Sequence, residues 1–85
     1  MEKQISKCGY KVSKLDFYQV HTVSQGACMC DRCSNFMIDG GTLIYVLNQI
    51  MCPACYEEWN ERAKFHKEDV PFEDTIIRRY GKLDV

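Results

Sequence analysis

The sequence has no excess of charge of one sign and no long hydrophobic run, and its first residues are mostly polar. Its 85 residues carry 11 Lys and Arg against 12 Asp and Glu, a formal net charge of -1, so the whole molecule has no positive field to attract nucleic acid. The longest purely apolar run covers residues 43–47, far short of the roughly 20 residues that span a bilayer. Residues 1–7 hold no apolar core of a signal peptide. We therefore expect a soluble, cytoplasmic protein.

Cysteine, by contrast, is abundant, with six residues in a chain that is short for one stable core. Four of them form the pattern Cys30-x2-Cys33-x18-Cys52-x2-Cys55, which lies within the spacing of a four-cysteine zinc site. A two-residue gap lets one tight turn direct two thiolates at an ion about 2.3 Å away, and the longer gap accommodates a hairpin that returns the second pair. Because thiols stay reduced without export, we predict one structural Zn²⁺ rather than disulfides.

The register of the first cysteine pair has an alternative. Cys28 precedes Cys33 by a four-residue gap and competes with Cys30 as a ligand. We prefer Cys30, because its two-residue gap suits a knuckle turn and repeats the spacing of the second pair. Cys8 and Cys28 are then left over, and we expect each to be a small buried residue, since free cysteine packs as a hydrophobe.

The segment before the cysteines predicts an N-terminal β-hairpin. Residues 9–12 form a short strand candidate, and residues 17–23 form a second one that is rich in β-branched and aromatic side chains. Residues 13–16 would be the turn between them. This part of the chain also holds the one basic patch of the sequence, which consists of Lys3, Lys7, Lys11 and Lys14.

A second hairpin is predicted between the two cysteine pairs. Asp39-Gly40-Gly41 is a turn signal, and strands follow over residues 42–47 and 49–51, with the bend at Asn48. A helix then begins at Cys52-Pro53, because proline suits the first helical position, where its missing N–H costs nothing.

Two helices are predicted after the last cysteines. An apolar stripe recurs at three- and four-residue steps along residues 55–67. Its members are Tyr56, Trp59, Ala63 and His66. A second helix runs over residues 71–80 and ends at Gly81, with residues 82–85 as a free tail. We therefore expect one α+β domain in three parts, namely an N-terminal β region (1–27), a zinc module (28–67) and a C-terminal helix with its tail (68–85).

The order of knuckle, hairpin and helix resembles a treble-clef zinc finger. The resemblance covers Cys30 to about Lys67 and depends on the four cysteines and the hairpin between them. It implies a fold and not a function, because treble clefs host DNA readers, protein adaptors, ribosomal proteins and nucleases. A site closed by four cysteines leaves no coordination position for substrate or water, which indicates a structural zinc.

Enzyme functions find little support in the sequence. Cys52-Pro53-Ala54-Cys55 resembles a thioredoxin-type redox motif, but the βαβ unit before it and the later hairpin with a proline loop are missing. A treble-clef nuclease would carry paired histidines on its hairpin and helix, whereas His21 and His66 both lie outside the hairpin. We expect no enzyme.

DNA binding is the alternative hypothesis. The cysteine spacing is one residue longer than that of GATA-type fingers, which read DNA with a helix and a basic tail after the last cysteines. Here residues 56–85 hold eight acidic side chains against six basic ones, and four thiolates on Zn²⁺ add about -2. Such a helix disfavours contact with phosphates. A small zinc-finger transcriptional regulator would have to use the N-terminal lysines instead.

A further resemblance concerns small zinc proteins carried by phages and conjugative elements of Gram-positive bacteria. It lies in Cys30-Asp31-Arg32-Cys33, in residues 43–48 and in the segment from Cys52 to Trp59. Some stand-alone, acidic, metal-binding phage proteins of this size are anti-CRISPR proteins, which bind the type II effector nuclease and stop it engaging DNA. The resemblance implies a host protein as partner, the host bacterial cytoplasm as location, and no catalysis.

We accordingly predict a non-catalytic protein-binding module whose acidic side chains face a basic partner. Tyr56 and Trp59 would mainly pack in the interior. The zinc ligands are Cys30, Cys33, Cys52 and Cys55. The predicted partner-binding residues are Glu57, Glu58, Glu61, Glu68, Asp69, Glu73 and Asp74.

Overall fold

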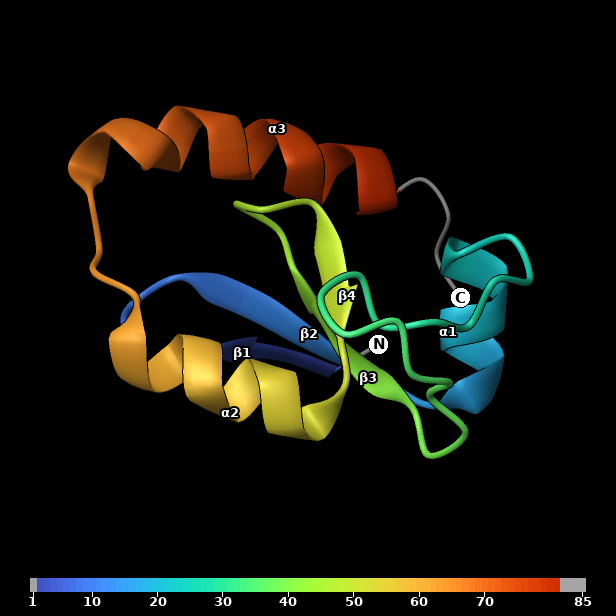
Figure 1. The fold of residues 1–85 in the computed structure, drawn as a ribbon. Coiled ribbons are helices and arrows are strands. Elements are labelled where there is room, and N and C mark those ends of the chain that lie inside the picture. Colours follow the sequence, from blue (N-terminus) through green and yellow to red (C-terminus); the bar gives the residue numbers. More distant parts are fainter. Residues whose placement is uncertain (1, 82–85) are drawn as a thin grey trace.

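A computed structural model describes residues 2–81, and it contains a four-stranded antiparallel sheet with helices on both sides (Figure 1). The strands pair in chain order and are β1 (Glu2–Ile5), β2 (Lys11–Leu15), β3 (Gly41–Ile44) and β4 (Gln49–Met51). The helices are α1 (Phe17–Val23), α2 (Pro53–Arg62) and α3 (Val70–Gly81), the last preceded by a short 3₁₀ turn, η1 (Lys67–Asp69). In Figure 1, α2 lies on one side of the sheet, α3 on the other, and α1 at one end. The tail expected at residues 82–85 lies outside the described residues.

The α+β class and the N-terminal β-hairpin are confirmed, but other residues form the hairpin. β1 and β2 pair with Ile5 opposite Lys11, and the turn is closed by the Gly9 N–H, which donates to the Ser6 carbonyl at 3.0 Å. Gly9 has a φ of +105°, a conformation that glycine adopts without strain. The predicted strand at residues 9–12 therefore begins too early, and the predicted turn at 13–16 is mostly strand.

The strand predicted at residues 17–23 is wrong, because this segment is helix α1. Asp16 caps it: its side chain accepts the Gln19 N–H at 2.8 Å, and the Gln19 side chain accepts the Asp16 N–H at 2.9 Å. This reciprocal pair satisfies two N–H groups that a helix start leaves without partners. A capping box thus outweighs the β propensity of the residues that follow.

The hairpin between the cysteine pairs is confirmed, but its first strand is shorter than the predicted 42–47, because β3 ends at Ile44 and residues 45–48 form the turn. Thr42 lies opposite Met51, and the bend falls at Asn48, whose N–H donates to the Tyr45 carbonyl at 3.0 Å and whose φ is +53°. The turn before β3 requires glycine at position 40 for two reasons. Gly40 has a φ of +95°, and a Cβ there would lie 2.2 Å from the Leu15 carbonyl oxygen.

Helix α2 begins at Pro53 as predicted but ends at Arg62, well before the predicted end at residue 67. The chain leaves the helix because the next residues bind the N-terminal hairpin instead. The Phe65 ring lies 5.0 Å from that of Tyr10, and the His66 N–H donates to the Tyr10 hydroxyl at 3.0 Å. His66 is therefore exposed and extended, so its predicted place on a buried helical stripe is wrong.

The core lies between β2, β3 and the elements that cover them. Its fully buried members include Val12, Leu43 and Ile44, and α3 contributes Ile76. A buried hydrogen bond joins the hydroxyls of Ser13 and Tyr45. The N-terminal hairpin and the hairpin between the cysteine pairs thus share one sheet, a union that the separate treatment of residues 1–27 and 28–67 did not predict.

Candidate metal centre

Four cysteines meet where the loop before β3 approaches the start of α2. The Sγ atoms of Cys30, Cys33, Cys52 and Cys55 all lie within 4.8 Å of one another. Tetrahedral coordination by four thiolates requires the sulfurs to surround one point in this way, at about 2.3 Å from the ion. The predicted set of four is therefore brought together, and it can hold a metal ion.

The first pair sits in a tight hairpin whose backbone points at sulfur. The Cys30 N–H donates to the Asn35 carbonyl at 2.9 Å, and the Ser34 N–H donates to the Cys30 carbonyl at 2.9 Å. This turn directs the N–H groups of Arg32 and Cys33 at the Cys30 Sγ, at 3.4 and 3.5 Å. Amides aimed at a sulfur stabilise its anionic form, which is the form that binds metal.

The second pair is held by β4 and the first turn of α2. Cys52 is the residue before the helix, Pro53 opens it, and Cys55 lies in its first turn. Because the helix leaves its first N–H groups without internal partners, this end favours negative charge. The Sγ atoms of Cys33 and Cys52, one from each pair, are 3.7 Å apart.

The pKa values of two thiols in the cluster, those of Cys30 and Cys55, differ widely. Burial alone would raise the pKa of Cys30, but hydrogen bonds from backbone N–H groups, including those of Cys33, Cys52 and Arg32, lower it to about 6. Desolvation and hydrogen bonds to the other three thiols raise the pKa of Cys55 to about 12. Four adjacent thiolates repel one another, so the set can be fully ionised only around a cation. The donor set therefore fits a soft or borderline divalent metal.

The question of Cys28 against Cys30 is settled in favour of Cys30. Cys28 lies outside the four-sulfur cluster, is buried, and adopts a φ of +53°. Its carbonyl accepts the Met37 N–H at 2.8 Å, so it extends the knuckle hairpin toward the core. Cys8 is half-buried at the tip of the β1–β2 hairpin, with its Sγ 3.1 Å from the Ser6 Oγ.

The knuckle also closes one edge of the sheet. The Asp31 N–H donates to the Ile50 carbonyl at 2.9 Å, and the Ile50 N–H donates to the Asp31 carboxylate at 2.7 Å. Asp31 lies between the first two ligands, so the same turn that holds the sulfurs occupies the outer hydrogen-bonding groups of β4. This role of Asp31 carried no signal in the sequence beyond its place inside the cysteine pair.

The seven acidic residues predicted to bind a partner do not form one surface. Glu73 is a correction, because only 3% of it is exposed and its carboxylate accepts the Lys11 N–H at 3.0 Å. Asp69 accepts the Tyr10 hydroxyl at 2.6 Å and is half-buried. A buried carboxylate that satisfies a backbone N–H stabilises the fold and is not available to a partner.

The remaining acidic residues are at least partly exposed, and three of them have basic neighbours. Glu58 pairs with Arg32 at 2.7 Å, Glu61 with Lys7 at 2.9 Å, and Asp74 with Lys11 at 3.7 Å. Exposed pairs of this kind contribute little to stability, so a partner can replace them. Glu57 and Glu68 are exposed and have no ion pair among residues 2–81.

Tyr56 and Trp59 pack as predicted. Their rings lie 6.1 Å apart, the Trp59 ring also lies 6.1 Å from that of Tyr10, and both Tyr56 and Trp59 are half-buried on α2. The four N-terminal lysines, by contrast, are dispersed. Lys7 and Lys11 are ion-paired, and the alternation along β2 places Lys11 and Lys14 on opposite faces of the sheet.

An exposed apolar surface at the knuckle was missed by the sequence reasoning. The knuckle hairpin directs Cys28, Cys30 and Met37 into the core. The alternate residues point outward, and together with Tyr18 of α1 they form what we call the knuckle patch. Its members are Tyr18 (81% exposed), Met29 (49%), Phe36 (58%) and Ile38 (66%).

Contacts within the knuckle patch link the knuckle hairpin with α1. Met29 and Phe36 face each other in an isolated β-bridge. The half-buried Phe17 ring connects the hairpin with α1, because it lies 5.8 Å from Phe36 and 6.0 Å from Tyr18. The available sequence signal was two short runs without a polar residue, at 28–30 and 36–38, because successive side chains of an extended segment point to opposite faces and cannot all be buried by one core.

The order of these parts along the chain, with a knuckle, a hairpin and a helix that together carry four cysteines, is the arrangement expected of a treble clef. Comparisons of the chain with family models, with curated proteins and with solved structures give no match. What the protein does must therefore follow from its own residues.

Proposed function

We propose that this chain is a protein-binding module stabilised by a structural zinc ion, and that it binds and inhibits the type II CRISPR effector nuclease of a bacterial host. Zinc is the metal that best suits four thiolates in a tetrahedral arrangement. All four positions are then filled by protein, which leaves the metal a structural role. The protein would act in the host bacterial cytoplasm, where its thiols stay reduced.

The observation that carries the proposal is the knuckle patch. Small soluble proteins rarely expose contiguous apolar side chains, and where they do, the patch commonly marks a contact with another protein. Aromatic residues such as Tyr18 and Phe36 supply much of the binding energy at such contacts. The knuckle beneath is held by two candidate metal ligands and by Asp31, so binding need not order the backbone that presents the patch.

Charge supports the type of partner. The effector nuclease holds its nucleic acids in positively charged channels. Glu57 and Glu58 project from α2, and Glu68 from the turn before α3, as exposed carboxylates. They favour the approach of a basic protein surface and disfavour that of nucleic acid. The dispersed lysines of the N-terminal hairpin provide no comparable surface for DNA.

The test is a DNA cleavage assay with a purified type II effector nuclease, its guide RNA and the zinc-loaded protein. We expect inhibition by the wild type and its loss in Phe36→Ser. Phe72→Ser is the matched control, because Phe72 is 53% exposed, close to the 58% of Phe36, but lies on α3. Failure of the protein to bind or inhibit the effector at micromolar concentration would refute the proposal.

A second arm separates the charge contribution from the apolar one. We expect Glu57→Lys and Glu68→Lys to slow association with the effector and to make it less dependent on salt, because both carboxylates act through long-range attraction. If instead the protein binds DNA directly, and the binding is lost when Lys3 and Lys14 are replaced, the transcriptional regulator is the better assignment.

A further inference from the structure

We infer that the outer edge of β1 and the groove beside it bind an extended peptide segment that alternates apolar and acidic side chains. The segment would add to the sheet as a fifth strand. This site is separate from the knuckle patch. It goes beyond the proposed function because it does not depend on which protein binds the knuckle patch.

The two edges of the sheet differ in their hydrogen bonding. At β4, the outer N–H and carbonyl of Ile50 are both bonded to Asp31. β1 is the other edge, and no segment within residues 2–81 pairs with its outer side. An unpaired strand edge is a template onto which another extended chain can add.

The register identifies the free backbone groups. The Ser6 N–H donates to the Tyr10 carbonyl at 2.8 Å, so these opposite residues form a hydrogen-bonded pair. Hydrogen-bonded and non-bonded pairs alternate along an antiparallel ladder, so Gln4 is bonded to Val12, while Lys3 and Ile5 are not bonded across it. The N–H and carbonyl groups of Lys3 and Ile5 therefore point outward from the sheet.

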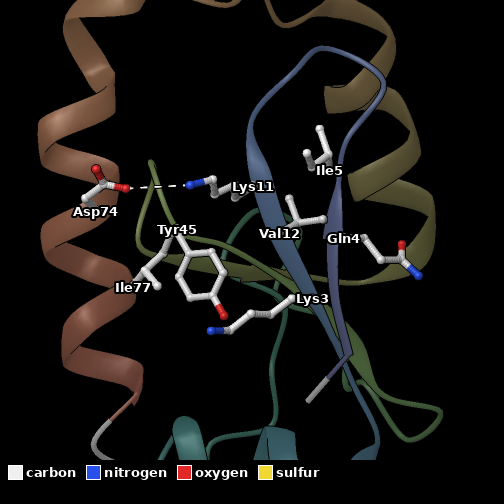
Figure 2. Close-up of a pocket in the computed structure, with 8 residues that line it drawn as sticks. All are labelled: Lys3, Gln4, Ile5, Lys11, Val12, Tyr45, Asp74 and Ile77. Carbon is white, nitrogen blue, oxygen red and sulfur yellow. Dashed lines mark ion pairs between the residues drawn. The ribbon is translucent and has the colours of Figure 1, made fainter.

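A groove of about 420 Å³ lies beside these groups, between the first two strands and α3 (Figure 2). Ile5 and Lys3 line it from β1, and Ile77 from α3, with Tyr45 at its floor. Ile5 is 73% exposed, so it offers apolar surface to a partner at this edge. An added strand would cover Ile5 with an apolar side chain of its own.

Charge identifies the second type of side chain. Lys11 already pairs with Asp74 across the groove at 3.7 Å. Lys3 has no carboxylate partner among the described residues, and its side chain extends from β1 toward the hydroxyl end of Tyr45 (Figure 2). Residues directly opposite each other on paired strands share a face, so an acidic residue opposite Lys3 would lie two positions from an apolar residue opposite Ile5. The matching segment is apolar-x-acidic in either direction.

The probe is a short synthetic peptide in which every second residue is threonine and the residues between are valine, glutamate and valine in turn. The readout is amide hydrogen exchange of the zinc-loaded protein. In the free protein we expect slow exchange at Gln4 and fast exchange at Lys3 and Ile5. Saturating peptide should slow exchange at Lys3 and Ile5 selectively. Absence of this protection at millimolar peptide would overturn the inference. So would protection that appears without peptide and grows with protein concentration, since it would assign the edge to a second copy.

Two pairs of variants separate backbone from side-chain recognition. Ile5→Pro removes an outward N–H without removing a bond to β2, and we expect it to abolish peptide binding, whereas Ile5→Thr keeps the N–H and should retain it. Lys3→Gln should weaken binding about threefold. Lys14→Gln removes the same charge on the opposite face, across the ladder from Glu2, without placing two carboxylates opposite each other, and should leave binding unchanged. Equal effects of the two substitutions would contradict the assigned site, and we expect neither to change the outcome of the nuclease assay.

Discussion

The two edges of the sheet are protected by different means. The β4 edge is fastened to the metal centre, because Asp31 lies between two ligands and bonds both outer groups of Ile50. The β1 edge lies in a hairpin whose inner strand, β2, pairs with β3, and whose other attachments are hydrogen bonds that involve side chains. Tyr10 binds the segment between α2 and α3, and Lys11 binds Glu73.

This difference separates stability from accessibility within one sheet. A small domain buries little apolar surface and gains much from a staple, and here the four cysteines that can hold a metal ion lie at one edge only. The edge near the four cysteines is already paired, whereas the outer hydrogen-bonding groups of the far edge have no partner strand among residues 2–81. The molecule thus concentrates its stabilisation in the part that does not offer backbone groups to a partner.

Removal of the metal should have the largest effect of all the changes considered, because it should unfold both edges of the sheet. Structural zinc sites contribute about 10–16 kcal/mol at neutral pH, more than a core of this size can supply. We expect a chelator or Cys33→Ser to abolish cooperative unfolding, as measured by circular dichroism. Amides that exchange slowly at the two edges, such as those of Gln4 and Ile50, should then exchange fast. Cys33 is exposed, so its replacement removes a ligand with little loss of packing.

Cys8→Ser is the matched control for metal removal. Cys8 lies outside the four-sulfur cluster at the tip of the opposite hairpin, and we expect its variant to bind one metal ion and unfold cooperatively. Equal loss of structure in Cys8→Ser would show that the free thiols share in coordination.

Replacement of Asp31 should make the β4 edge resemble the β1 edge, because the Ile50 N–H would then lack an acceptor on its outer side. In Asp31→Ala the Ile50 N–H loses a charged acceptor at 2.7 Å, and such bonds contribute about 1.5–3 kcal/mol. We expect a loss of about 2 kcal/mol in the free energy of urea unfolding, together with faster exchange of the Ile50 amide. Asp39→Ala removes an exposed carboxylate in the turn before β3 and should change neither quantity.

Loss of the Tyr10 hydroxyl should loosen the opposite hairpin while leaving the metal centre intact. It donates to Asp69 at 2.6 Å and accepts from the His66 N–H at 3.0 Å, so Tyr10→Phe should cost about 1 kcal/mol. Tyr18→Phe is the control, because that hydroxyl belongs to an exposed residue of α1. Unchanged stability in Tyr10→Phe would contradict this attachment.

The same hydroxyl predicts a loss of stability in alkali. Burial and the hydrogen bond to Asp69 raise the pKa of Tyr10 above its ordinary value of 10.0. The folded state therefore holds this proton more tightly than the unfolded state, and the stabilisation is fully present below pH about 10. It should be lost as pH rises through the folded pKa. Tyr10→Phe should remove this part of the pH dependence in urea titrations.

The sequence predicted the parts of the molecule that depend on local spacing. The four ligands, the hairpin between them, the start of α2 at Pro53 and the extent of α3 all follow from the positions of cysteine, glycine and proline. Such residues act through chain geometry over a few positions, so no tertiary contact is needed to interpret them.

The errors arose where two local signals competed or a distant contact decided. Residues 17–23 carried β propensity, but Asp16 and Gln19 formed a capping box, a signal that was present and overlooked. The end of α2 at Arg62 had no local signal, because it depends on Tyr10, more than fifty positions away in the sequence. The burial of Glu73 likewise depends on the distant Lys11 N–H, which no periodicity along α3 could indicate.

The smallest effects should come from the exposed ion pairs at the two ends of α2. Arg32 pairs with Glu58 at the metal end, and Lys7 pairs with Glu61 at the hairpin end. In double-mutant cycles with glutamine, we expect coupling close to the experimental error at both ends, and less still at high salt. The hydrogen bond from Arg32 lowers the pKa of Glu58, so any stabilisation by this pair is present above the unfolded pKa and is lost as pH falls through the folded one. A large coupling at Arg32–Glu58 alone would mean that the knuckle is held to α2 by charge as well as by metal, and that the metal end has a second staple.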